Sequence, residues 1–179
     1  MKPLHLTLIC HALTDAQRTG YLSSRHDTIL PLAALPWSHD ASVKVLSAPE
    51  RRAQETAALL GSPVRLESAL ADCDLGSWQG LALKQLQAEQ PEALAQWLGD
   101  PCSNPHGGES FAELRQRVTT WLGAFEERGD WLAVTHPWVI RAVLVEVLGA
   151  PLATQARIDV LPLSRVCLSH TGQWRLRLA

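Results

Sequence analysis

The sequence predicts an α/β fold, a three-layer sandwich in which helices flank a mostly parallel central sheet. Short apolar runs at 4–10, 43–47 and 131–135 have the length and composition of buried strands. The segments between these runs are long enough for helices, and 111–125 repeats apolar residues at helical spacing. Strands that alternate with helices favour a parallel sheet, and 179 residues suit one domain over 1–179.

The first half of the chain alternates strand and helix signals. Ser47 is an expected N-cap, and with Glu50 it forms an expected capping box around Pro49. The elements expected in order are a strand at 4–10, a loop or loose helical turn at 12–27, a short helix within 28–37 ended by Pro36, a strand at 43–47, a helix from Ser47 to about Leu60 stopped by Gly61, and a strand at 64–66.

The second half begins with a glycine-containing loop and then becomes helical. Ser110 and Glu113 form another expected capping box, which opens the most regular helix of the sequence. The expected elements are a loop at 70–80, helices at 81–89 and 91–98, a loop at 100–108, a helix from 111 that ends before Gly129, a strand at 131–135, a helix at 138–148, and two or three strands in 157–178 with a hairpin at Thr171-Gly172.

Charge and cysteine usage restrict the class of protein. The net charge is −2, and no basic stripe marks a nucleic-acid or anionic-membrane surface. The four cysteines have no C-x-x-C spacing, which suits a reduced cytosolic protein. We see no signal peptide, and the longest apolar stretch, 138–153, is too short to span a membrane. We therefore expect a cytoplasmic protein.

Two expected strands end in histidine in the same way. LTLIC is followed by His11, and WLAVT is followed by His136. Carboxyl ends of parallel strands form the edge where open α/β sheets bind ligands. A single histidine at a strand end is more often structural, but a matching pair indicates a functional site.

An arginine pair lies between the two histidines in sequence. Arg51 and Arg52 fall in the first turn of a helix that follows a strand. The free N–H groups of a helix start already favour anions, and a guanidinium strengthens such a phosphate site. One member of the pair is expected to be a solvated surface arginine.

These motifs together resemble the histidine phosphatase superfamily in its phosphoglycerate-mutase-like branch. The matching segments cover about 150 residues in the family's order, and the details around WLGDP and HGGES are most similar to the α-ribazole phosphatase subgroup. The segments are Cys10-His11-Ala12, SAPERRAQETA (47–57), Asp72 before Gly76-Ser-Trp-Gln-Gly80, HGGES (106–110) and Thr135-His136-Pro137.

The resemblance implies a role for each of four residues. His11 would attack phosphorus and carry a phosphohistidine. Arg52 would hold the phosphoryl oxygens, and His136 would donate a hydrogen bond to the same group. Asp72 would protonate the leaving oxygen and then activate water. The implied ligand is a small phosphorylated molecule or free phosphate, with no cofactor or metal.

The sequence departs from the family pattern at several positions of this site. Cys10 replaces the first arginine, and loss of one such donor typically costs about 10²–10³ in rate. Ala12 replaces a glycine, and Asp72 replaces a longer glutamate. Pro137 and Trp138 stand where the family has glycines after the second histidine. These changes predict a phosphatase with reduced or altered activity.

Other residues are expected near the phosphoryl group. Arg18 and Arg25, in the polar segment after His11, are candidates to replace the charge lost at Cys10. Glu109 belongs to the loop that lies over the pocket in relatives.

Three other functions come into question for the same residues, and the sequence counts against two of them. The departures suit a non-catalytic protein that binds a phosphoryl ligand on the same fold. A zinc site formed by His11, His136 and Asp72 lacks short ligand spacing and would be opposed by the charge of Arg52. A cysteine nucleophile would need an arginine six residues after Cys10, where the chain has Ala16.

Overall fold

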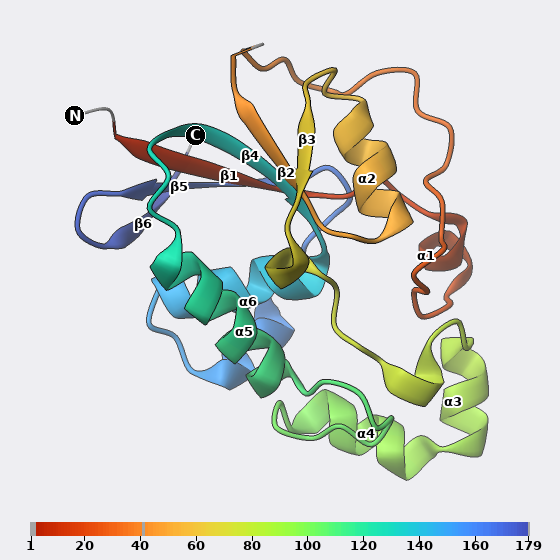
Figure 1. The fold of residues 1–179 in the computed structure, drawn as a ribbon. Coiled ribbons are helices and arrows are strands. Elements are labelled where there is room, and N and C mark those ends of the chain that lie inside the picture. The colour runs from red at the N-terminus through yellow and green to blue at the C-terminus, as the bar shows by residue number, and fades with distance from the viewer. Residues whose placement is uncertain (1–2, 41, 179) are drawn as a thin grey trace.

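The structure is a computed structural model that describes residues 3–40 and 42–178. Its centre is a six-stranded sheet with the strand order β3-β2-β4-β1-β5-β6 (Figure 1). The strands are β1 (Leu4–Cys10), β2 (Lys44–Ser47), β3 (Val64–Leu66), β4 (Gly129–Thr135), β5 (Arg165–His170) and β6 (Trp174–Arg177).

The sheet is mixed, with a parallel part and an antiparallel hairpin. β1, β2, β3 and β4 run parallel to one another, whereas β5 pairs antiparallel with β1 and with β6. The tail therefore forms the expected hairpin, and its turn uses Gly172 at φ 94°. The predicted α/β fold with a mostly parallel sheet is confirmed.

Helices cover both faces of this sheet. The helices are α1 (Asp15–Thr19), α2 (Arg51–Ala58), α3 (Leu83–Glu89), α4 (Pro91–Gly99), α5 (Phe111–Ala124) and α6 (Pro137–Val147). Figure 1 shows α2 on one side of the sheet, α5 and α6 on the other, and α3 and α4 farther from it. The fully buried Leu6, Leu8 and Ile9 of β1 lie at the middle of the core.

Two predictions for the first half of the chain are wrong. No helix forms in 28–37, because the backbone N–H groups of Ile29 and Leu30 bond to Glu55 and to the carbonyl of Leu13 instead. The helix expected from Ser47 begins at Arg51, because Ser47 is the last residue of β2 and its hydroxyl bonds to the carbonyl of Ala48.

The expectations for the second half are closer to the structure. The predicted helices at 81–89 and 91–98 correspond to α3 and α4, and the capping box of Ser110 and Glu113 opens α5 as expected. However, α5 ends at Ala124, and Gly129 begins β4 with φ 110°. Three short 3₁₀ turns lie at Ser68–Leu70, Gly76–Trp78 and Leu152–Arg157.

Candidate active site

The two histidines lie side by side because their strands are parallel neighbours in register. Cys10 pairs with Thr135, so the residue after each strand emerges at the same sheet edge. The backbone N–H of His11 donates to the carbonyl of Thr135 at 3.0 Å. The ring centroids of His11 and His136 are 5.1 Å apart. The structure thus brings together the pair expected from the matching strand ends.

The ring of His11 is oriented for nucleophilic attack. Its Nδ1 donates to the carbonyl of Ala12 at 2.7 Å, which leaves the lone pair on Nε2. Burial, with the charges of His136 and Arg52, lowers the pKa of His11 to about 3. The ring is therefore neutral at neutral pH, as a nitrogen nucleophile must be.

Arg52 connects three parts of the site. Its Nε donates to His11 Nε2 at 3.3 Å, and its Nη1 donates to the carbonyl of Ser24 at 2.6 Å. Its Nη2 donates to Asp72 Oδ2 at 2.5 Å. The side chain is 1% exposed, so it is the buried member of the arginine pair, whereas Arg51 is exposed and pairs with Glu55.

Asp72 lies on the loop after β3, within reach of Arg52 and His136. Its Oδ2 contacts Arg52 and lies 3.6 Å from His136 Nδ1. Its Oδ1 accepts from the backbone N–H of Cys73 at 2.9 Å. Burial raises the pKa of Asp72, but the charges of His136 and Arg52 outweigh burial and hold the pKa below its usual range. The carboxylate is therefore ionised in this arrangement.

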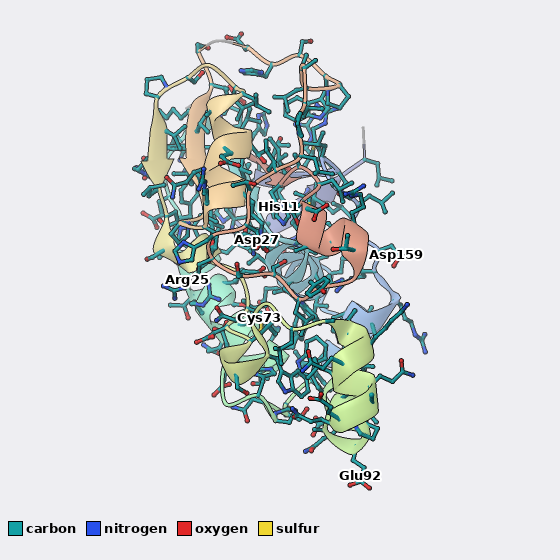
Figure 2. The ribbon with its side chains drawn as sticks, turned by 90° about the vertical axis from the view of Figure 1, so that its right-hand side faces the viewer. His11, Arg25, Asp27, Cys73, Glu92 and Asp159 are labelled. Carbon is teal, nitrogen blue, oxygen red and sulfur yellow. The ribbon has the colours of Figure 1, made fainter. Side chains whose placement is uncertain are left out.

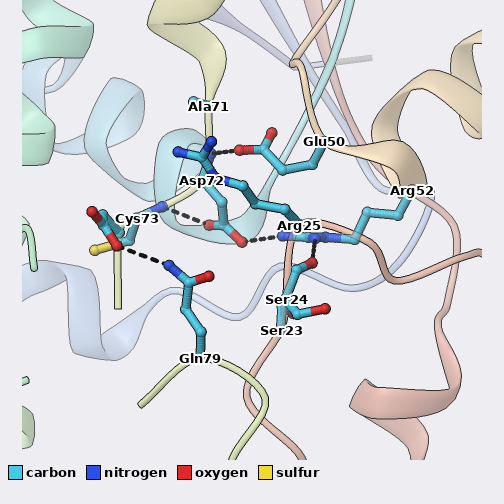
Figure 3. A pocket seen from close by; sticks show the side chains of 10 residues that line it. Ser23, Ser24, Arg25, Glu50, Arg52, Ala71, Asp72, Cys73 and Gln79 are labelled. Atoms are coloured by element: carbon cyan, nitrogen blue, oxygen red, sulfur yellow. Dashed lines mark hydrogen bonds and ion pairs between the residues drawn. The ribbon is translucent and has the colours of Figure 1, made fainter. Parts of the chain in front are cut away.

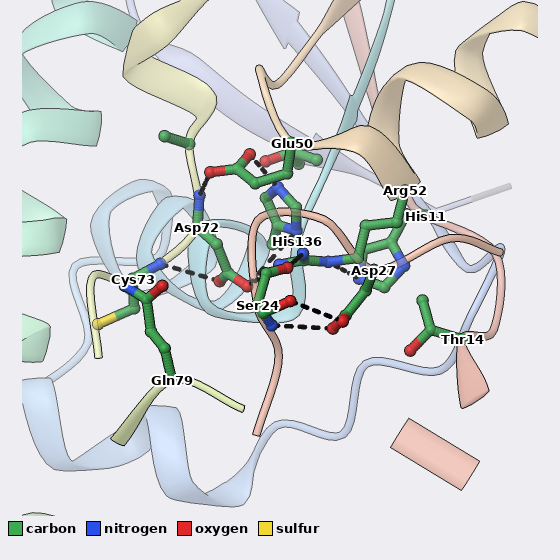
Figure 4. A network of polar contacts seen from close by, with 12 residues as sticks. His11, Thr14, Ser24, Asp27, Glu50, Arg52, Asp72, Cys73, Gln79 and His136 are labelled. Carbon is green, nitrogen blue, oxygen red and sulfur yellow. Dashed lines mark hydrogen bonds and ion pairs between the residues drawn. The ribbon is translucent and has the colours of Figure 1, made fainter. Parts of the chain in front are cut away.

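His136 is held from the side opposite Asp72. It is fully buried, and its Nε2 contacts Glu50 Oε2 at 2.7 Å (Figure 4). Since an ionised carboxylate can only accept hydrogen bonds, His136 Nε2 is the donor in this contact. The buried Nδ1 makes no hydrogen bond to any described residue. The second carboxylate oxygen of Glu50 accepts from the backbone N–H of Asp72 at 3.1 Å.

Cys10 contributes no charge to this site. Burial raises the pKa of its thiol to about 12, and the Asp72 charge adds to that effect. Arg52 and Arg141 act in the opposite direction on the pKa of Cys10. Arg141 lies on α6, donates from Nε to the carbonyl of Ile158 and stacks on Trp138. Its charge thus reaches Cys10 from the helix that follows His136.

Ala12 fits its position without backbone strain. Among the described non-glycine residues only Leu163 has a positive φ, so Ala12 does not need glycine-only angles. The backbone N–H of Ala12 donates to Thr56 Oγ1 at 2.9 Å, and the Thr56 hydroxyl donates to the carbonyl of Arg52. Thr56 therefore fixes the loop after β1 against α2.

A small polar pocket of about 40 Å³ opens beside Arg52 and Asp72 (Figure 3). Its lining includes Glu50, Ser24 and the exposed Arg25. The Arg25 guanidinium forms no ion pair with another described residue. Figure 2 places Arg25 and His11 between the sheet and the α3–α4 segment. Of the two arginines expected to supply charge, Arg25 thus lies at this pocket.

The other two expected residues are engaged elsewhere. Arg18 lies on α1 and pairs with Asp15 at 2.5 Å, and both side chains are exposed. Glu109 pairs with Arg117 of α5 at 2.8 Å. Arg117 also donates to the carbonyls of Ala69, Ala71 and Asp72. Arg117, paired with Glu109, therefore supports the backbone of the loop at 69–72 that carries Asp72, called the acid loop below.

Three residues that organise this site were not expected to do so. Glu50 was expected in a capping box, but its carboxylate makes no cap contact and reaches His136 instead. Thr56 lies within the matched segment 47–57 but had no expected role, and Arg117 lies outside every matched segment. Trp138, one of the two departures after His136, contacts Trp97 and Phe111 with ring centroids 5.3 and 6.1 Å apart.

Residues 3–40 and 42–178 contain neither a metal-binding cluster nor a helix that could span a membrane. No group of three or more His, Cys, Asp or Glu side chains there is placed to hold a metal ion. No helix in that part of the chain is long and apolar enough to cross a bilayer. Each of the four cysteines is free of disulfide bonds.

Comparisons with known proteins agree with this geometry. Glucosyl-3-phosphoglycerate phosphatase of Mycobacterium tuberculosis is 30% identical over 176 residues, which cover 86% of this chain and 79% of the relative. Adenosylcobalamin/alpha-ribazole phosphatase of Salmonella typhi is 26% identical over 167 residues, or 84% of this chain and 83% of the relative.

A solved structure and a family model complete the comparison. The complex of mycobacterial glucosyl-3-phosphoglycerate phosphatase with inorganic phosphate has a TM-score of 0.76 at 25% identity, covering 98% of this chain and 96% of that chain. The family model for branch 1 of the histidine phosphatase superfamily matches residues 6–178. The two histidines at the strand ends and the buried arginine agree with this match. This chain belongs to the histidine phosphatase superfamily.

Proposed function

We propose that this protein hydrolyses a small phosphomonoester through a phosphohistidine at His11. The observation that carries the proposal is the state of His11. Its Nε2 carries the lone pair because Nδ1 donates to the carbonyl of Ala12, and burial keeps the ring neutral. Arg52 lies 3.3 Å from that nitrogen, where it would meet the charge on a phosphoryl group.

The proposed reaction has two displacements at phosphorus. In the first, Asp72 has taken up a proton from solvent as the substrate binds. His11 Nε2 then attacks in line, the bond to the leaving oxygen breaks, and Asp72 gives that oxygen its proton. In the second, Asp72 takes a proton from water, the water oxygen attacks phosphorus, and the P–N bond breaks. Inorganic phosphate leaves, and His11 returns to its neutral form.

Asp72 has to change partner during this cycle. Its carboxylate occupies Arg52 Nη2, a donor that a phosphoryl oxygen would also use. A phosphoryl dianion that displaces the carboxylate removes its cation and adds an anionic neighbour. Both changes raise the proton affinity of Asp72, which is what an acid catalyst needs. We assign to Arg25, which lines the pocket, the electrostatic attraction of the substrate phosphate.

The activity is expected to be lower than that of a site with a second arginine in place of Cys10. A buried neutral thiol donates weakly and adds no charge, so the equatorial oxygens lose one stabilising contact. Arg141 lies on the same side as Cys10, but it is engaged with Ile158 and Trp138.

The experiment compares the wild type with His11→Ala on a panel of phosphomonoesters. We expect His11→Ala to remove turnover and to remove the phosphohistidine that mass spectrometry detects after acid-free quenching. His5→Ala is the matched control, because His5 lies at the opposite end of β1 and pairs with Asp130. Unchanged turnover in His11→Ala would contradict the proposal.

A non-catalytic phosphoryl binder is the second candidate. The observation that favours it is the contact between Arg52 and Asp72, since the acid and the anion-binding group neutralise each other. This alternative predicts that inorganic phosphate binds near Arg52 while no ester in the panel is cleaved. Calorimetric titration with phosphate beside the turnover assay separates the two functions.

A further inference from the structure

Glu50 is a buried carboxylate with both oxygens engaged in the site. Oε2 accepts from Nε2 of His136 at 2.7 Å, and Oε1 accepts from the backbone N–H of Asp72 at 3.1 Å. The residue is 6% exposed. Figure 4 shows its side chain turned toward both groups and away from the axis of α2.

The local fold alone does not account for this side chain. Glu50 has extended backbone angles directly before α2, but its carboxylate makes no capping hydrogen bond. Burial of a carboxylate is unfavourable unless it is paired and hydrogen-bonded. His136 provides that compensation and, against the effect of burial, holds the pKa of Glu50 below its usual range. The charged carboxylate is thus maintained by the site.

Glu50 fixes which ring nitrogen of His136 faces Asp72. With Nε2 bonded to Glu50, Nδ1 is the nitrogen that lies 3.6 Å from Asp72 Oδ2. That Nδ1 is buried and makes no hydrogen bond to a described residue. An unpartnered polar atom in such a place is expected to serve a ligand. A phosphoryl oxygen that replaces the Asp72 carboxylate would meet this nitrogen.

Glu50 also fixes the base of the acid loop. Its bond to the Asp72 backbone holds that residue from α2, while Arg117 of α5 holds the same loop through the carbonyls of Ala71 and Asp72. The side chain of Asp72 is one methylene shorter than a glutamate, so its reach depends strongly on its backbone position. A shift of about 1 Å at such a group is costly in rate.

We propose that Glu50 is a positioning residue that sets His136 and Asp72 together for phosphoryl transfer. This inference rests on the phosphomonoesterase function proposed above. The groups that face His136 are Glu50 from the position directly before α2, Asp72 from its loop and His11 from the position directly after β1. A histidine donates from both nitrogens only in its protonated form, and Glu50 supplies the counter-charge for that form.

The decisive variant is Glu50→Gln. A carboxylate accepts from two donors, whereas the glutamine amide has one accepting oxygen and one donating NH₂. One of the two N–H groups would therefore face another donor. We expect kcat to fall about 10- to 100-fold with a smaller change in KM, because positioning is lost in the transition state more than in binding.

The matched control is Glu55→Gln, in the helix α2 that follows Glu50. Glu55 also accepts two hydrogen bonds, from Arg51 and from the backbone N–H of Ile29, but it faces away from His136. We expect its kcat to stay within about twofold of the wild type. Thermal unfolding of both variants shows whether any loss of activity comes from loss of folded protein.

A spectroscopic measurement on the wild type covers the case in which Glu50→Gln does not fold. Ring ¹⁵N spectra, with His136 assigned by His136→Gln, should show Nε2 protonated and hydrogen-bonded. Addition of inorganic phosphate should move the Nδ1 signal more than the Nε2 signal. An unprotonated Nε2 at neutral pH would overturn the proposed contact.

The outcomes separate this inference from the proposed function. If the wild type cleaves esters and the folded Glu50→Gln variant matches it, the inference is wrong and the function stands. If the wild type cleaves no ester but binds phosphate at least 10-fold more tightly than Glu50→Gln, the function is wrong, and Glu50 orients His136 for anion binding rather than for phosphoryl transfer. If the wild type neither cleaves esters nor binds phosphate, both are wrong.

Discussion

At the scale of single residues, Cys10 determines how much positive charge a phosphoryl group would meet. The thiol is fully buried and neutral, so Arg52 is the arginine in direct contact with His11. Phosphoryl transfer depends mainly on positioning and on cations around the equatorial oxygens. One residue at the end of β1 thus bears directly on the rate.

The first prediction concerns Cys10→Arg. A guanidinium at this position would add a charged donor beside His11, and we expect kcat/KM for phosphomonoesters to rise about 10-fold or more. The added bulk and the nearby charges of Arg52 and Arg141 should lower the melting temperature at the same time. Steady-state kinetics and thermal unfolding measure the two effects.

Cys10→Ala is the control, because it removes the thiol without adding charge. Its kcat/KM should stay within a few-fold of the wild type. If Cys10→Arg is folded and gains no activity, the low charge at Cys10 does not limit the rate.

The second prediction concerns Asp72→Asn. An amide cannot deliver the proton that an alkoxide leaving group needs, and such general acids contribute about 10²–10⁴ in rate. We expect a large loss with glycerol 2-phosphate and a smaller loss in the first step with p-nitrophenyl phosphate, whose leaving group needs no proton. Single-turnover kinetics with both esters measures the difference. Equal losses with both esters would show that Asp72 is not the acid.

At the scale of elements, α5 supports the acid loop through Arg117. The guanidinium donates to backbone carbonyls at 69, 71 and 72 and pairs with Glu109. Loops carry few internal hydrogen bonds, so external donors of this kind decide how well they are fixed. Arg117 therefore links the loop that carries Asp72 to α5.

The third prediction is that Arg117→Gln lowers both stability and kcat. Several carbonyls and the Glu109 carboxylate lose their donors, and the free energy of unfolding should fall by about 1–3 kcal/mol. We expect kcat to fall about 10-fold, since Asp72 loses its fixed backbone position. Arg65→Gln is the control, because Arg65 pairs with Glu127 where both side chains are about half exposed. Equal effects of the two variants would contradict the supporting role.

Elements were predictable from sequence where local signals and packing agree. The strand before His11, the strand before His136 and the helix capped by Ser110 match the structure closely. The start of α2 could not be predicted from the sequence, because Ser47 completes β2 and pairs with Val134 of β4. A capping motif reports only on neighbouring residues and carries no information about strand pairing. The same motif assigned Glu50 to the helix cap, although its carboxylate contacts His136.

At the scale of the whole molecule, the site is a set of polar groups enclosed by the core. His11, Arg52 and His136 are each at most 1% exposed, although all are polar. Buried groups of this kind are stable only in the protonation state that their partners favour. The stability of the fold and the chemistry of the site therefore depend on the same titrations.

This coupling predicts that acid unfolds the protein. The pKa of His11 is lowered from 6.5 to about 3, so between these values the unfolded chain binds the extra proton and the folded chain does not. Stability is thus fully present above pH 6.5 and is lost as the pH falls. Burial lowers the pKa of His106 as well, and the lowered pKa values of Asp72 and Glu50 extend the loss to lower pH.

We expect the free energy of unfolding to drop by on the order of 3 kcal/mol between pH 6.5 and pH 4. Urea unfolding followed by circular dichroism over this range measures the slope. His11→Asn, which has no titrating ring, should remove most of the slope above pH 4.5, and what remains would come from His106. A slope that is unchanged in His11→Asn would mean that folding does not lower the pKa of His11, and burial would then not be what keeps the attacking ring neutral.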